Sequence, residues 1–214
     1  MTDAGLTLRE RKKLRTRHAL VDEALRLFTE KGFAAATLDE LVEAVEVSQR
    51  TFFRMFASKE DVALAPEKEL WAAYSARVEA HPPGPSPLPD YVAALRAAVE
   101  EMADGWEARF LTSRALCDRT PALVAHSLRH CADVTDRVVA LGLAPGQSEL
   151  ERRLLIELFL TAWRWALARW AEDGAPDRAA LRSRMDDAFA ALPDLAPLLS
   201  AAPRHEEARR GVHA

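Results

Sequence analysis

The sequence predicts an all-α protein, and two observations carry that prediction. Alanine and leucine abound whereas only 8 of the 214 residues are glycine, a composition that favours helices over sheets. Apolar residues also recur at steps of three and four, which is the helical period. Hydrophobic residues make up 49% of the chain and charged residues 29%, so the chain can bury a core and is not expected to be disordered.

The first sixty residues are expected to form four helices, each bounded by a capping signal. They are Leu8 to Lys31, Leu38 to Val45, Gln49 to Phe56, and a fourth that begins after Ser58. Gly32 is a suitable C-terminal cap for the first helix. The capping boxes Thr37-x-x-Glu40 and Ser58-x-x-Asp61 open the second and fourth helices, and Ser48 is the expected N-cap of the third.

Two features divide the rest of the chain. Pro66 should end or kink the fourth helix near Leu64, and a new helix should run from Pro66 to about Glu79. The proline-rich stretch His81 to Asp90 is expected to be a loop, because each proline removes a donor and clashes with the preceding turn. Five more helices are expected after it: Pro89 to Met102, Gly105 to Asp118, Pro121 to Leu141, Glu149 to Glu172 and Asp177 to Leu199.

The short helices between Thr37 and Phe56 predict a helix-turn-helix, because about three residues join two helices with apolar faces. Phe52 and Phe56 lie one turn apart and are expected to pin the third helix to the other two. Its outer arc then holds Gln49, Arg50, Phe53 and Arg54. Arg50 and Gln49 can form bidentate pairs with guanine and adenine, each worth about 1–3 kcal/mol of discrimination in the major groove. The alternative is a packing module that merely resembles a helix-turn-helix.

The charge distribution supports DNA binding although the net charge is −4. The segment RERKKLRTR, Arg9 to Arg17, holds six basic residues and one acidic residue. We expect this basic arm, and Arg11, Lys12 and Arg15 in particular, to meet phosphates while the acidic body keeps the protein soluble. The alternative for Met1 to Leu8 is a solvated, disordered leader.

Three further residues are expected near the phosphate backbone. Thr37 and Ser48 cap helix N-termini, whose backbone N–H groups also receive phosphate. Lys59 opens the fourth helix and is expected to reach the DNA backbone.

The segments TLDELVEAVEVSQRTFFRMFASKEDV and RTRHALVDEALRLFTEKGFAAAT resemble the signature of the TetR family of regulators. The resemblance covers about Leu8 to Val62, and RALCDRTPALVAHSL resembles a segment of some actinobacterial members. The resemblance to the TetR family implies nine or ten helices, a homodimer, and a repressor that a small molecule releases from a palindromic operator. It also implies phosphate contacts at Thr37, Phe53 and Lys59, and base contacts at Gln49, Arg50 and Thr51.

Three positions depart from the family pattern. Glu46 stands in the turn where the family commonly has Gly, so a positive φ there would cost roughly 1 kcal/mol. Phe53 replaces a common Tyr and cannot donate a hydroxyl to phosphate. Met55 replaces a commoner His or Tyr. The set of DNA contacts is therefore expected to be atypical.

The expected organisation has four parts. Residues 1–57 form the arm and the DNA-binding domain, and residues 58–80 form connecting helices. Residues 81–201 form the effector-binding and dimerisation domain, and residues 202–214 form a disordered tail. Pro66 lies where the two domains meet and is a candidate hinge.

The helix Glu149 to Glu172 is apolar over most of its circumference, which predicts burial on two sides. One side would pack against its own domain and the other against a second copy of the chain. The candidate interface residues are Leu158, Trp165, Met185 and Phe189. The resemblance implies a four-helix dimer interface of this helix and the last one; the alternative is the central helix of a monomeric bundle.

An effector pocket is expected between the middle helices. Its candidate lining residues, each of which is otherwise ordinary core or surface, are Trp106, Arg109, Phe110, Arg114, Cys117, His126 and Trp163. No metal is expected, because the helical period turns Cys131 inward and His126 outward, so that these two and His130 do not converge. No cofactor is expected either.

Other classes of protein are disfavoured. No phosphate loop, HExxH, GxGxxG or nucleophile elbow occurs, which argues against an enzyme, and an all-helical enzyme remains the distant alternative. The sequence contains no apolar run of about 18 residues without charge, so no membrane-spanning helix is expected. The start MTDAGLTLRERKK does not resemble a secretory signal. Two cysteines suggest reduced thiols in a cytoplasmic protein. The nearer alternative is a DNA-binding regulator that responds to no ligand.

Overall fold

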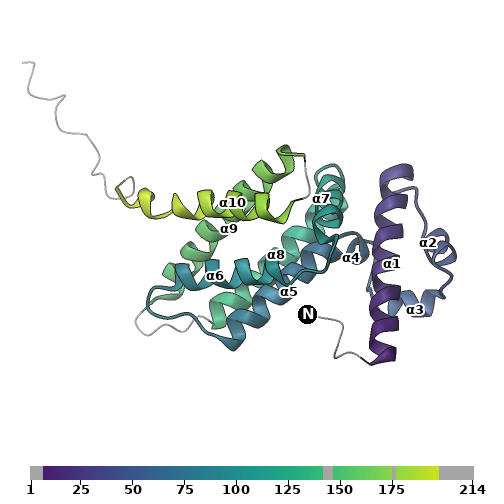
Figure 1. Ribbon diagram of the computed structural model, residues 1–214, viewed down its shortest axis with the longest axis horizontal. Coiled ribbons are helices and arrows are strands. Elements are labelled where there is room, and N and C mark those ends of the chain that lie inside the picture. The colour runs from purple at the N-terminus through teal and green to yellow at the C-terminus, as the bar shows by residue number, and fades with distance from the viewer. Residues whose placement is uncertain (1–6, 142–146, 175–176, 198–214) are drawn as a thin grey trace, which may run out of the picture.

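The computed structural model describes residues 7–141, 147–174 and 177–197, and within these ranges the chain forms ten α-helices and no strand (Figure 1). The all-α prediction is confirmed. In chain order the helices are α1 (Leu8–Lys31), α2 (Leu38–Ala44), α3 (Gln49–Phe53), α4 (Lys59–Ala63), α5 (Ala65–Ala80), α6 (Pro87–Glu100), α7 (Trp106–Cys117), α8 (Pro121–Leu141), α9 (Glu149–Glu172) and α10 (Arg178–Ala190), with a 3-10 helix η2 (Pro193–Leu195). The predicted tail, residues 202–214, lies outside the described residues.

The predicted caps of the N-terminal helices are confirmed. Thr37 and Glu40 form a capping box at α2, Ser48 accepts from the Thr51 N–H at α3, and Ser58 accepts from the Asp61 N–H at α4. Helix α3 is shorter than predicted, because it ends at Phe53. The chain then tightens into a turn in which the Met55 N–H donates to the Phe52 carbonyl, 2.8 Å away.

The N-terminal helices share one hydrophobic core that also receives residues from the second half of the chain. Leu20, Leu25 and Phe28 of α1 are buried in it beside α2, α3 and α4. Leu116 of α7 and Leu123 of α8 belong to the same core. Because this core is closely packed, a displacement of α7 or α8 would shift the helices that form the helix-turn-helix.

The predicted break at Pro66 is confirmed, and α7 completes the hydrogen bonds around it. Helix α4 ends at Ala63, and α5 begins at Ala65 with Pro66 in its first turn. The Ser113 hydroxyl donates to the Ala63 carbonyl at 2.6 Å, and the Trp106 indole N–H donates to the Pro66 carbonyl at 3.0 Å. Two buried hydrogen bonds thus fix α7 to the α4–α5 junction.

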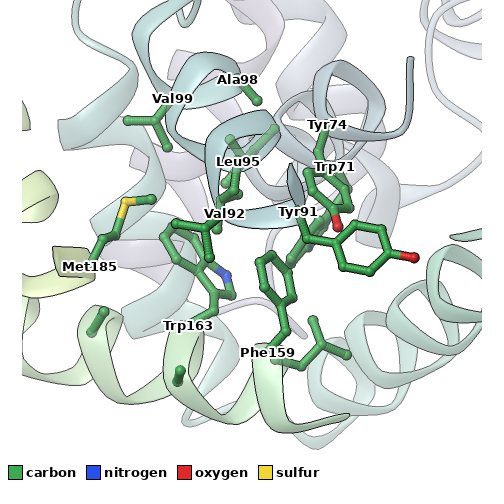
Figure 2. Packing of buried hydrophobic residues seen from close by; sticks show 14 of the residues in the cluster. Trp71, Tyr74, Tyr91, Val92, Leu95, Ala98, Val99, Phe159, Trp163 and Met185 are labelled. Atoms are coloured by element: carbon green, nitrogen blue, oxygen red, sulfur yellow. The ribbon is translucent and has the colours of Figure 1, made fainter. Parts of the chain in front are cut away.

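A second core joins the six helices from α5 to α10 and is rich in aromatic rings (Figure 2). Phe159 of α9 lies at its centre, stacked on Tyr74 at a ring-centroid distance of 5.6 Å and on Phe189 at 5.1 Å. Trp163 lies one turn further along α9, beside Trp71 of α5 (Figure 2). These rings hold α9 against the rest of the C-terminal half.

Two further predicted boundaries are wrong, and proline explains both. The stretch His81 to Asp90 is not entirely loop, because α6 begins at Pro87. Proline is tolerated in the first helical turn, where its missing N–H has no intrahelical partner. Helix α10 ends at Ala190, short of the predicted Leu199, because Pro193 interrupts the pattern and the chain continues as η2. Residues 198 and 199 lie outside the described residues.

Candidate DNA-binding surface and ligand cavity

Helix α3 is held in place by its buried side and presents its other side to solvent. Phe52 is completely buried and its ring centroid lies 5.6 Å from that of Phe56, as the spacing predicted. Phe53, the next residue, is 53% exposed. Because α1, α2 and α3 lie at one end of the molecule, the outer face of α3 is clear of the large C-terminal bundle (Figure 1).

Most of the predicted DNA-contacting side chains are exposed. The exposed set is Arg11, Lys12, Arg15, Thr37, Ser48, Gln49, Arg50, Phe53 and Arg54, and the half-buried ones are Thr51 and Lys59. Within the described part of the chain, the side chains of Arg50 and Arg54 make no hydrogen bond or ion pair. Their guanidinium groups are therefore available to acceptors outside the protein.

Two of the predicted contact residues already have partners inside the protein. The Lys59 ammonium donates to the carbonyls of Phe33 (2.7 Å) and Ala36, and lies 4.7 Å from the centroid of the Phe33 ring. Burial lowers the pKa of Lys59. The Gln49 amide donates to the Asp39 carboxylate of α2. Lys59 thus ties α4 to the α1–α2 connection, and Gln49 has to exchange its partner before it can read a base.

Arg17, the last residue of the basic arm, is directed into the protein instead of toward solvent. Its guanidinium lies 4.4 Å from the centroid of the Phe56 ring and donates to the Met55 carbonyl at 3.1 Å. It also forms an ion pair with Glu69 of α5 at 3.3 Å. Charge alone could not separate Arg17 from the other arm residues; its contacts with the turn after α3 and with α5 do.

Glu46 adopts φ = 55°, the left-handed conformation that the resemblance to the family suggested. It is the single non-glycine residue with positive φ among the residues described. Its backbone N–H donates to the Glu43 carbonyl at 3.0 Å, which closes the turn between α2 and α3. A non-glycine residue in this conformation costs roughly 1 kcal/mol, so the turn that joins α2 to α3 is strained.

A cavity of about 380 Å³ lies between α5, α7, α8 and α9. Its walls are largely aromatic and aliphatic, with a few polar groups. The lining residues are Glu67, Trp71, Phe110, Leu111, Arg114, Cys117, Asp118, Val124, Ser127, Leu128, Cys131, Leu160, Trp163, Arg164, Leu167, Ala168 and Ala171. Leu128 is 64% exposed and so marks the mouth.

Glu67 is the charged residue that is buried among the described residues lining this cavity, and the sequence did not single it out. Its two carboxylate oxygens accept from the Ser127 hydroxyl at 2.8 and 3.1 Å, and the Arg114 guanidinium lies 3.7 Å away. A signal existed in the sequence: Glu67 shares the inward stripe of α5 with Trp71 and Tyr74, at helical spacing. A carboxylate in register with such a stripe is a better candidate than an isolated aromatic residue.

Four of the seven predicted pocket residues line the cavity: Phe110, Arg114, Cys117 and Trp163. The other three do not. Trp106 is buried and binds the Pro66 carbonyl, and Arg109 faces Asp22 of α1 at 3.8 Å. His126 faces α4. A rotation of about 100° per residue turns Arg109 away from the face of α7 that carries Phe110 and Arg114. Trp106 shares the face of Phe110, whose ring centroid lies 4.7 Å from its own, but it lies one turn nearer the start of α7, beside Pro66.

His126 is not directed outward, which corrects that part of the prediction, whereas Cys131 is directed inward as predicted. The His126 Nε2 lies 3.0 Å from the Asp61 carboxylate, and the Cys131 sulfur lies 3.7 Å from that of Glu67. Among the described residues no group of three potential ligands could hold a metal ion. Neither cysteine is in a disulfide, and burial raises the pKa of Cys131 to about 12, so this thiol stays protonated.

Asp61 connects α8 with the turn that follows α3. One carboxylate oxygen contacts His126 and the Lys68 ammonium, and the other accepts from the Ala57 N–H at 2.9 Å. Burial opposes ionisation of Asp61, but the hydrogen bonds from Lys68 and Ala57 outweigh it and lower the pKa. Asp61 is thus a carboxylate that joins a cavity helix to the DNA-binding end.

The predicted dimer residues fall into two groups. Leu158 and Trp165 are exposed and lie on one face of α9 with Leu150 and Leu154. Met185 and Phe189 of α10 are buried in the core of their own chain, so their side chains offer little surface to a second copy. Helix periodicity identified an apolar face on α10 but could not say what covers it.

In the described part of the chain, no helix is both long enough and apolar enough to cross a membrane.

Comparison with known proteins places the helix-turn-helix in a recognised group. Residues 20–65 match the family model described as bacterial regulatory proteins, tetR family. Over 200 residues the chain is 35% identical to the HTH-type transcriptional regulator TcmR of Streptomyces glaucescens. That similarity covers 89% of this chain and 88% of the relative, and so extends well beyond the helix-turn-helix into the half that holds the cavity.

Proposed function

Because this chain belongs to the TetR family of bacterial transcriptional regulators, we propose that it represses transcription from a palindromic operator and is released by a small molecule. The observation that carries the DNA-binding part is the outer face of α3. Arg50 and Arg54 stand there with no partner among the described residues, on a helix fixed by the buried Phe52. Such a helix can enter the major groove with its N-terminal residues at the base edges.

We propose that the protein acts as a homodimer through α9. A stripe of four large apolar side chains is exposed along this helix. The stripe consists of Leu150, Leu154, Leu158 and Trp165. A monomer gains nothing from leaving these side chains in water, so the stripe marks a surface that a partner would cover. The neighbouring α10 packs along α9 and would lie at the edge of the interface (Figure 1). A twofold dimer places two recognition helices about 34–36 Å apart, which suits a palindromic site.

The cavity supports a ligand-responsive regulator over one that responds to no ligand. Its volume of about 380 Å³ lies in the range of small-molecule sites, and it combines apolar walls with a few polar groups. The ligand releases DNA only if it binds more tightly to a conformation that cannot span both half-sites.

The contacts suggest how the cavity communicates with α3. Helix α8 contributes Ser127 and Cys131 to the cavity wall, and the same helix holds Asp61 through His126. Asp61 in turn accepts from the Ala57 N–H in the turn after α3. A shift of α8 on ligand binding would therefore move the end of the recognition helix, and Pro66 at the α4–α5 junction is the proposed hinge.

The operator is the test of this proposal. The full chain is used to select bound duplexes from a random pool, and we expect two inverted half-sites whose centres lie about one helical turn apart, or a multiple of it. Arg50→Ala should lower the discrimination between bases at one position of the half-site by about 1–3 kcal/mol. Arg182→Ala on the distant α10 should leave the base preference unchanged. Recovery of no preferred sequence would contradict the proposal.

The contribution of the basic arm is tested separately by salt dependence. Removal of residues 1–13 should weaken binding to every sequence alike and flatten the dependence on salt, by a slope of about 0.9 for each phosphate that the arm no longer neutralises. If the shortened chain bound as tightly as the full chain at both low and high salt, the proposed role of Arg11 and Lys12 would be wrong.

A further inference from the structure

We propose that Glu67 is the recognition residue of the cavity, and that the ligand it selects is a neutral aromatic molecule that carries a hydroxyl or N–H donor. This inference rests on the proposed function, because it assumes that the cavity between α5, α7, α8 and α9 is where the effector binds.

The first step is the acceptor capacity of the Glu67 carboxylate. The residue is 4% exposed yet lines the cavity, and acidic residues are almost never buried to that degree without partners. An ionised carboxylate has about four lone-pair sites. Among the described residues its hydrogen-bond donors are the Ser127 hydroxyl, shared between both oxygens, and the Cys131 thiol at 3.7 Å. Sites remain for a donor from a molecule in the cavity.

The second step is the balance of charge around the cavity. The charged lining residues are two acids, Glu67 and Asp118, and two bases, Arg114 and Arg164. Arg114 lies between both acids, 3.7 Å from Glu67 and 3.2 Å from Asp118. A cationic ligand at Glu67 would meet Arg114 at short range, and an anionic ligand would meet Glu67 itself. A neutral donor avoids both repulsions and still makes a charge-assisted hydrogen bond.

The third step is the shape of the walls beside Glu67. Trp71 lies one turn along α5 from Glu67, and its ring meets that of Trp163 edge-to-face at a centroid distance of 6.2 Å (Figure 2). Phe110 meets the same Trp163 ring at 6.5 Å. Flat aromatic molecules gain from stacked and edge-to-face contacts with such rings. The donor of the ligand would then be held at Glu67 while its rings lie among these three side chains.

A matched series of four biphenyls separates the possibilities, measured by equilibrium dialysis against the full chain without DNA. They are 4-phenylphenol (a neutral donor), 4-methoxybiphenyl (the same rings without the donor), 4-(aminomethyl)biphenyl as its ammonium ion, and biphenyl-4-carboxylate. We expect the phenol to bind about ten- to a hundredfold more tightly than its methyl ether, the range for a hydrogen bond to a charged group. The two ions should bind more weakly than the phenol.

Two variants assign the effect to Glu67. Glu67→Gln should remove most of the preference for the phenol over the ether, and Glu79→Gln, an exposed carboxylate on the same helix, should leave it unchanged. Circular dichroism checks that each variant is folded. If the Glu67→Gln chain does not fold, the series with the unaltered chain still decides whether the cavity prefers a neutral donor, as a carboxylate in its wall requires.

The inference is overturned if the phenol and the ether bind equally, if none of the four binds, or if the ammonium ion binds best. It is also overturned if folded Glu67→Gln keeps the full preference. Because dialysis needs no DNA, these results stand apart from the operator selection. A chain that selects an operator but ignores the donor refutes the role of Glu67 alone, and a chain that prefers the donor but selects no DNA refutes the proposed regulator.

Discussion

Helix α3 and the ligand cavity each depend on a side chain that is almost fully buried, but the two side chains differ in kind. In α3 the buried residue is Phe52, an apolar anchor, and the groups proposed to meet DNA point away from it into solvent. In the cavity the buried residue is Glu67, a charged group that is itself proposed to meet the ligand. The first residue acts by fixing a backbone, and the second acts by its own chemistry.

This difference says which substitutions should be informative in each region. Around α3, removal of the anchor should abolish function through stability, whereas changes on the outer face should alter recognition and leave the fold intact. Around the cavity, an isosteric change of charge should alter recognition although the altered side chain is inside.

Phe52→Ala should destabilise the protein by about 3–5 kcal/mol, because the ring is fully buried and the small core around α3 cannot refill its volume. The neighbouring change Phe53→Ala removes a ring that is 53% exposed and should alter the free energy of unfolding by less than about 0.5 kcal/mol. Urea denaturation followed by circular dichroism measures both values. Similar losses for the two variants would mean that α3 is not held by one buried face.

Trp165→Glu should break the proposed dimer, because it places a charge in the exposed apolar stripe of α9 at a cost of about 2 kcal/mol or more to association. Sedimentation velocity should then show a monomer that no longer protects an inverted repeat. Leu128→Glu makes the same kind of change at another exposed apolar residue, at the cavity mouth, and should leave the dimer intact. Dissociation by both variants, or by neither, would argue against α9 as the interface.

The helices and caps of the N-terminal region were predicted closely from the sequence, and the reason is local. The signals at Thr37, Ser48 and Ser58 are hydrogen bonds within three residues, so a single stretch of sequence contains both partners. The positive φ of Glu46 was suggested by the resemblance to the family, which commonly has glycine in this turn. The sequence did not indicate that the Arg17 side chain turns inward, because its partners Phe56 and Glu69 are distant in the sequence.

The cavity was predicted only in part, because its polar groups meet through tertiary contacts. Glu67 and Ser127 are 60 residues apart, and neither segment indicates the other. Of the three aromatic residues predicted to line the cavity, Phe110 and Trp163 do so, whereas the Trp106 indole donates to the Pro66 carbonyl at the α4–α5 junction. Periodicity identifies the inward face of a helix but cannot distinguish a cavity from a core.

His126→Ala should weaken the link between cavity and recognition helix without changing either site, because His126 holds Asp61 but lines no part of the cavity. We expect the ratio of DNA affinities without and with saturating 4-phenylphenol to fall by roughly two- to thirtyfold, the range of about 0.5–2 kcal/mol for residues that carry coupling. His81→Ala, at an exposed position after α5, is the control. An unchanged ratio would place the coupling elsewhere, with the hydrogen bonds of Ser113 and Trp106 as the next candidates.

Glu46→Gly should stabilise the protein by about 0.5–1 kcal/mol, since glycine adopts φ = 55° without the clash that a Cβ brings. Glu43→Gly, three residues earlier inside α2, should instead destabilise by about 1 kcal/mol, because there glycine only loses helix propensity. In urea denaturation the changes in the free energy of unfolding should have opposite signs for the two variants if the turn is strained, and the same sign if it is not. Operator affinity measured on the Glu46→Gly chain adds a second result. If relief of the strain alters the angle between α2 and α3, base discrimination by Arg50 falls even as stability rises, and the glutamate then trades stability for the orientation of the recognition helix.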